Sequence, residues 1–358
     1  MPILDQGYQH WDGALAGRGL RWLAITRQGV KAQFKNRWLI SVLVGALGPA
    51  LLLAGFLIAW GLFEQKAKVL DPLLFLFQGL PEEIRQGPAA FRSTFWTLAF
   101  TLFFRVQTFF AFLLVMLVGP DLISQDLRFN ALPLYLSRPL RRIDYFLGKL
   151  GVIAAFLAGT MLIPALLAYL IGLAFSLDPA VLGDTWRVLG ASAAFSAVAA
   201  VSMGLLMLAL SSLSRNSRFV TVMWVAFWML GNAAADAARR GPGREWAPLA
   251  SYSACLASIR DSLFDREAEW DRLTEVFRKS REAVSGGFGG GLGFPFGPRR
   301  PPPMIFGPDG QEIPMPPELT DDEDPRPPWP WSAGVLAGMA GASAAGLSTR
   351  VPSLARLK

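Results

Sequence analysis

The sequence contains a single cysteine, Cys255, and a single histidine, His10. One thiol cannot form an intramolecular disulfide, and one Cys with one His cannot supply the three or four ligands of a zinc site. A disulfide framework and a His/Cys metal centre are therefore excluded, and we expect no bound cofactor.

Charge is also scarce, since 17% of the 358 residues are charged, 53% are apolar and the mean hydropathy is +0.37. Soluble domains usually carry about 25% charged residues. The apolar surplus is concentrated in long runs, which indicates membrane spans.

Signatures of catalysis are missing as well. No glycine-rich loop ends in Gly-Lys-Ser/Thr, the sequence that cradles nucleotide phosphates. The glycines at 286–293 are followed by Phe and Pro, as in a linker. The apolar runs contain no Asp, Glu or His that could act as a general base or metal ligand. We therefore expect that the chain is not an enzyme.

Six runs approach the roughly 20 apolar residues that cross a bilayer as a helix. They are Trp38–Phe63, Phe95–Val118, Leu150–Phe175, Leu189–Leu213, Phe219–Ala235 and the Gly/Ala/Ser-rich Trp331–Leu347. The predicted fold class is an all-α polytopic membrane protein with six transmembrane helices.

Basic residues predict the orientation of these spans. Sixteen Lys and Arg lie in 1–37, 119–149, 214–218 and the C-terminal tail, against five in the short opposite loops 64–94 and 176–188. Because basic residues favour the cytoplasmic side, both termini are predicted to be cytoplasmic in a cell (inner) membrane. The basic residues that give the net charge of +7 therefore lie mainly along the predicted inner membrane face. We expect no nucleic-acid partner.

The predicted organisation has four parts. Residues 1–37 form a cytoplasmic amphipathic segment at the lipid interface, and 38–234 hold spans one to five with the cytoplasmic loop 119–149. Residues 235–330 form a long extracytoplasmic loop, and 331–358 hold the sixth span and a basic tail.

The long loop divides in two. Apolar residues recur at steps of three, four or seven from Leu249 to Phe277, which predicts an amphipathic helix. Residues 284–330 contain nine Gly and thirteen Pro, a composition typical of linkers.

Prolines and tryptophans in the runs give two local expectations. Pro49 and Pro164 free backbone carbonyls that neighbouring helices must satisfy. Five tryptophans are expected to anchor the outer ends of spans at the lipid interface: Trp60, Trp96, Trp186, Trp329 and Trp331.

Three polar residues inside the spans are candidates for a transport pathway: Arg105, Gln107 and Asn232. Arg105 alone carries a charge, which marks either a functional group or a side chain that reaches the outer face. Gln107 and Asn232 either line a path or form hydrogen bonds between helices.

The connection between the second and third spans, Asp121 to Lys149, mixes charges with apolar residues and contains a Pro that ends a helical run. It resembles the signature of the ABC-2 type permease family, the membrane subunits of ATP-binding-cassette (ABC) transporters. The matching positions are Asp126, Leu136, Ser137, Arg138, Pro139, Arg142, Tyr145, Gly148 and Lys149. Asp126 stands where Glu is commoner in the family, and the insertion 284–330 departs from the family pattern.

This resemblance implies a transport subunit driven by a separate cytoplasmic ABC ATPase and paired with a second permease subunit, identical or related. Asp126, Arg138, Pro139, Arg142, Tyr145, Gly148 and Lys149 would form the loop that couples to the ATPase. The alternative is a membrane scaffold that binds a partner through the extracytoplasmic segment 245–330.

Overall fold

The computed structural model describes residues 21–66, 80–131, 142–176, 178, 180–239, 246–285, 304–306, 312–314 and 328–356. The elements are α1 (Arg21–Gln33), α2 (Arg37–Glu64), α3 (Glu82–Gln86), η3 (Pro88–Phe91), α4 (Arg92–Val118), α5 (Pro120–Arg128), α7 (Arg142–Leu157), the π-helix η4 (Ala158–Leu162), α8 (Ile163–Ser176), α9 (Ala180–Leu213), α10 (Ser217–Arg239), η5 (Ala247–Ala250), α11 (Tyr252–Leu263), α12 (Arg266–Ser285), β1 (Met304–Phe306), β2 (Glu312–Pro314) and α13 (Trp329–Arg356).

Five helical stretches within the described residues are long and apolar enough to cross a membrane, as in multi-pass membrane proteins. They are Arg37–Glu64, Pro88–Arg128, Ile143–Ser176, Ala180–Leu213 and Ser217–Arg239, and they coincide with the first five predicted spans. The predicted sixth span falls in α13, whose 28 residues are long enough. Gly, Ala and Ser dilute its apolar content, so α13 is not among the five.

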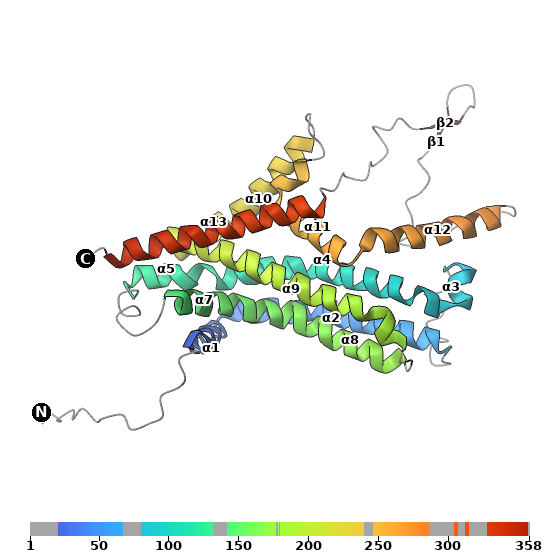
Figure 1. Cartoon of the computed structure of the whole chain (residues 1–358), viewed down its shortest axis with the longest axis horizontal. Helices are drawn as coiled ribbons and strands as arrows, with labels where there is room; N and C mark the ends of the chain where they lie inside the picture. Colours follow the sequence, from blue (N-terminus) through green and yellow to red (C-terminus); the bar gives the residue numbers. More distant parts are fainter. Residues whose placement is uncertain are drawn as a thin grey trace, which may run out of the picture.

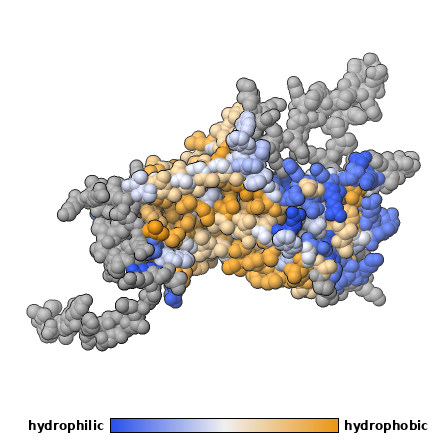
Figure 2. Space-filling model, viewed as in Figure 1, coloured by the Kyte–Doolittle hydropathy of each residue, from blue (hydrophilic) through white to orange (hydrophobic). Residues whose placement is uncertain are grey.

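The helices α2, α4, α9 and α13 and the pair α7–α8 lie side by side along a common direction, and α10 leaves them at an angle (Figure 1). One end of this bundle, here called the α1 end, holds α1, α5, the start of α7 and the last turns of α13. The opposite end, the α3 end, holds α3 and the far end of α12. On the face in view, Figure 2 shows an apolar surface band over the middle of the bundle and a hydrophilic surface at the α3 end. This banding is the surface pattern of a protein that lies in a bilayer.

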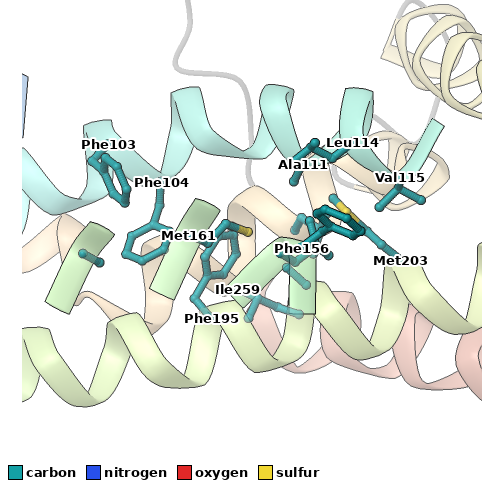
Figure 3. Packing of buried hydrophobic residues seen from close by; sticks show 14 of the residues in the cluster. Phe103, Phe104, Ala111, Leu114, Val115, Phe156, Met161, Phe195, Met203 and Ile259 are labelled. Carbon is teal, nitrogen blue, oxygen red and sulfur yellow. The ribbon is translucent and has the colours of Figure 1, made fainter. Parts of the chain in front are cut away.

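The core is packed by aromatic and long aliphatic side chains (Figure 3). Phe104 of α4 meets Phe195 of α9 edge to face, with ring centroids 5.3 Å apart. Ile259 of α11 belongs to the same cluster, so part of the loop between α10 and α13 folds back onto the bundle. Because lipid tails are as apolar as these side chains, close packing rather than escape from water holds such helices together.

The amphipathic stretch after α10 is two helices rather than one. α11 ends at Leu263, Asp265 adopts φ 51°, and α12 starts at Arg266. The turn lets the buried Phe264 pack on Phe104, with ring centroids 5.6 Å apart. A straight helix would carry α12 away from α4, so tertiary packing overrides the continuous pattern. Farther on, β1 and β2 pair antiparallel inside the Pro-rich segment.

Two predicted interface anchors are wrong. Trp60 and Trp96 are buried, at 1% and 0% exposure. The other three, Trp186, Trp329 and Trp331, are 61%, 56% and 57% exposed, as expected of anchors. Trp60 stacks on Phe95 at 4.0 Å, so its ring is used for packing between α2 and α4.

Candidate functional site

The α1 end contains a short helix, α5, whose start is fixed by a serine from another helix. Ser211 Oγ of α9 accepts hydrogen bonds from the backbone N–H groups of Ile123 and Ser124, both at 3.1 Å, and donates to Pro120 O at 2.8 Å. The free N–H groups in the first turn of a helix need such acceptors. α5 is therefore held at a fixed angle against α9.

The end of α5 is equally defined. Asn130 adopts φ 50°, a left-handed conformation that Asn tolerates, and the Ala131 N–H donates to Asp126 O at 2.9 Å. In this helix-ending arrangement, a carbonyl of the last turn accepts a hydrogen bond from a residue that follows the helix. It places the Asp126 side chain on the last full turn before residues 132–141.

Asp126 joins α5 to α7. Its Oδ2 atom lies 2.7 Å from Lys149 Nζ and accepts a hydrogen bond from Tyr145 Oη at 2.6 Å. The side chains of Lys149 and Asp126 are only 14% and 13% exposed. Lys149 Nζ also lies 5.4 Å from the centre of the Tyr145 ring, within cation–π range. One carboxylate oxygen therefore ties together the two ends of the connection.

The helix α1 packs against α7 along a seam of small residues. Thr26 Oγ1 of α1 donates a 3.0 Å hydrogen bond to Gly148 O. A Cβ atom at Gly148 would lie 2.6 Å from Ile25 Cβ, and one at Gly151 would lie 2.4 Å from Thr26 Oγ1. Only glycine leaves room for the two backbones at this distance, so α1 packs directly against the backbone of α7.

We expect Gly148→Ala to separate α1 from α7 and lower the free energy of unfolding by about 1 to 2 kcal/mol, since overpacking outweighs the gain in helix propensity. The measurement is the thermal unfolding of the purified chain in detergent. Gly190→Ala in α9 is the control, because an added Cβ there meets nothing within 4 Å. Equal stability of the two variants would contradict the close seam.

The structure brings together four of the seven residues predicted for the coupling loop. Asp126, Tyr145 and Lys149 form one cluster, and Gly148 lies between that cluster and α1. Arg142 is the first residue of α7. Arg138 and Pro139 lie outside the described residues.

Gln107, a predicted pathway residue, is fully buried and forms hydrogen bonds between helices. Its Nε2 atom donates to Thr160 O at 2.5 Å and is 3.4 Å from Ala46 O. Thr160 lies in the π-helix η4, one turn before Pro164, which has no N–H to donate. A side chain of the neighbouring helix α4 therefore supplies a donor to a backbone carbonyl near Pro164.

The other two pathway candidates lie on the surface of the chain. Asn232 Oδ1 accepts hydrogen bonds from Ser251 Oγ and, at 2.8 Å, from Ser253 Oγ, so it joins α10 to the start of α11. Arg105 is exposed on α4. These contacts do not bring Gln107, Asn232 and Arg105 into one pathway.

An ion cluster around the buried Arg92, at the α3 end, was not predicted from the sequence. Arg92, at the start of α4, is 3% exposed and contacts Glu64 at 2.8 Å, Asp178 at 3.0 Å and Asp184 at 3.0 Å. Glu64 also accepts a 2.7 Å hydrogen bond from Trp60 Nε1. The cluster clamps α2, α4 and α9 together. Two residues in the sequence could have indicated this cluster: the acidic Glu64, directly after the first apolar run, and Arg92, just before the second.

A comparison of the sequence with models of protein families finds no match, and a comparison with curated proteins finds none either.

Proposed function

We propose that this chain is the membrane-spanning permease subunit of an ABC transporter, of the ABC-2 type, and that a separate cytoplasmic ATPase subunit supplies the energy. The observation that carries the proposal is the Asp126–Tyr145–Lys149 cluster. It joins the last turn of α5 to the second turn of α7, so the two helices that flank the connection are fixed to each other. A docking loop needs this property to transmit force.

In this proposal the α1 end faces the cytoplasm, α13 is the sixth span and both termini are cytoplasmic in a cell (inner) membrane. A second permease subunit, identical or related, completes the membrane part of an exporter. Closure of the ATPase on ATP pushes the connection, and α5, α7 and the attached α1 tilt as a unit. Such rigid-body rocking between two packed arrangements is a common form of switching.

We expect the double reversal Arg138→Glu with Arg142→Glu to reduce transport per ATP hydrolysed by at least about tenfold, because two charge-assisted contacts of roughly 1.5–3 kcal/mol each become repulsive. The measurement is ATP hydrolysis and transport by the reconstituted complex, beside membrane insertion of the variant. Arg215→Glu with Arg218→Glu is the matched control, since it makes the same charge change in the other short connection at the α1 end.

Two results would count against the proposal. One is equal loss in the control, which would indicate a general effect of surface charge. The other is ATP-independent transport by the purified chain alone. Loss of function on deletion of 284–330, with the Arg138/Arg142 variant fully active, would favour the scaffold function instead.

A further inference from the structure

Arg105 occupies an unusual position for a charged residue. It lies within the candidate span Pro88–Arg128, yet its side chain is exposed on α4. Among the residues that the structure describes, it makes no hydrogen bond or ion pair. A guanidinium exposed within a span is costly unless it meets water or an anion.

The turn between α11 and α12 brings two more arginines to the same part of α4. Phe264 lies in this turn and packs on Phe104, the residue directly before Arg105. Arg260 and Arg266 flank Phe264, and both contact Asp261, at 2.7 Å and 3.1 Å. Arg105, Arg260 and Arg266 are called the arginine cluster below.

The arginine cluster is rich in positive charge. The Arg260 side chain is only 8% exposed and shares the Asp261 carboxylate with Arg266. Burial lowers the pKa of Arg260, Asp261 opposes this, and the nearby charges of Arg266 and Arg105 lower the pKa further. Asp265 and Glu267 are the next acidic residues along the chain, and both side chains are exposed. Arg105 and Arg266 are therefore close enough to repel the guanidinium of Arg260, which is itself largely shielded from water.

The place of the arginine cluster on the molecule indicates what neutralises it. The turn between α11 and α12 lies where the apolar band gives way to the hydrophilic surface of the α3 end (Figures 1 and 2). In a bilayer this is the level of the lipid headgroups, whose phosphates lie just beyond the hydrocarbon. Guanidinium groups bind phosphate oxygens through paired hydrogen bonds.

We infer that the arginine cluster binds the phosphate of an anionic phospholipid, with Arg105 as the contact on α4 and Arg266 as the contact on α12. Arg260 is held by its ion pair with Asp261 and adds positive charge to the site without contacting the phosphate. The lipid fixes the α11–α12 hairpin to α4. This inference does not depend on the proposed transport function.

The test is lipid binding to the purified full chain, measured by native mass spectrometry during titration with phosphatidylglycerol. We expect Arg105→Gln to weaken binding by about tenfold or more, the effect of one lost charge-assisted hydrogen bond. Arg105→Lys, which keeps the charge, should lose less. Arg187→Gln is the matched control, because Arg187 is also exposed on a long helix near the α3 end. Arg266→Gln repeats the test from α12 should the first variant fold poorly.

Equal affinity of Arg105→Gln and Arg187→Gln for phosphatidylglycerol would overturn the inference. Parallel titrations separate lipid from free anion and from general adhesion. If inorganic phosphate displaces phosphatidylglycerol from the unmodified chain, the site binds a free anion and the lipid assignment is wrong. If zwitterionic phosphatidylcholine binds as tightly as phosphatidylglycerol, the assignment to an anionic lipid is wrong.

Discussion

Replacement of Arg92 by Met is expected to lower the free energy of unfolding by about 3 to 5 kcal/mol, the usual cost of removing one partner from a buried ion pair. The Glu64 side chain is 5% exposed, so its carboxylate would stay desolvated and, among the described residues, would keep only the hydrogen bond from Trp60 Nε1. Asp178 and Asp184 are 45% and 49% exposed and can turn to water, so Glu64 carries most of the cost.

The measurement is thermal or denaturant unfolding of the purified chain in detergent. Arg85→Met on α3 is the control, because Arg85 is exposed at the same end of the bundle. An exposed substitution changes stability by less than about 0.5 kcal/mol. The double variant Arg92→Met with Glu64→Gln should recover part of the loss, since a neutral amide removes the uncompensated charge. A loss in Arg92→Met no larger than in Arg85→Met would show that the carboxylates find other partners.

Asp178 adds a small pH dependence to this cluster. The Ala180 N–H and then Arg92 hold the pKa of Asp178 below its ordinary value of 3.8. A carboxyl group whose pKa is lower in the folded protein stabilises the fold above that ordinary value, and the contribution is lost as the pH falls below it. Because the side chain is half exposed, the contribution is small.

The sequence predicts the long helices well because their signal is local. Each of the first five runs is apolar over enough residues to cross a bilayer, and each is a helix in the structure. The start of α4 at Arg92 could not be found in this way. Hydropathy ends a span where a charge appears, whereas Arg92 is accommodated by carboxylates from α2, from the connection between α8 and α9, and from α9.

The break between α11 and α12 is another tertiary effect. The helical spacing of apolar residues resumes after Phe264 at Trp270 and Leu273, so the pattern reads as one helix and does not predict the left-handed Asp265. The buried positions of Trp60 and Trp96 could not be predicted for a similar reason. An amphipathic ring suits both a lipid interface and a bundle core, and only the neighbours decide between them.

The candidate site at the α1 end could be predicted in part from the sequence. Tyr145 and Lys149 are four residues apart, so a helix places them on one face. The resemblance to a known signature marked Asp126 as well. Tyr145 and Lys149 can both contact Asp126 Oδ2 only at the observed angle between α5 and α7. Ser211 of α9, which is distant in the sequence, helps to set that angle.

Exchange of the two charges of the Asp126–Lys149 ion pair tests whether this ion pair serves a function. Lys149→Met should lower the free energy of unfolding by about 2 to 4 kcal/mol, since the Asp126 carboxylate is 13% exposed and would lose its cation. Tyr145→Phe removes one hydrogen bond from the same oxygen and should cost about 1 kcal/mol. The double variant Asp126→Lys with Lys149→Asp should regain much of the stability lost in Lys149→Met, because it restores the attraction with the charges exchanged.

On the proposed permease function, Lys149→Met in a complex reconstituted with the ATPase should reduce transport per ATP hydrolysed by about threefold to thirtyfold, which corresponds to roughly 0.5 to 2 kcal/mol of coupling energy. The exchanged double variant should recover most of this ratio if the connection acts through its firm attachment to α5 and α7. A double variant that regains stability but stays uncoupled would instead assign a direct contact with the ATPase to Asp126 or Lys149. Full coupling in Lys149→Met, measured at a temperature where that variant stays folded, would remove the ion pair from the mechanism. Because stability and coupling are measured on the same proteins, a folding defect cannot be mistaken for a loss of force transmission.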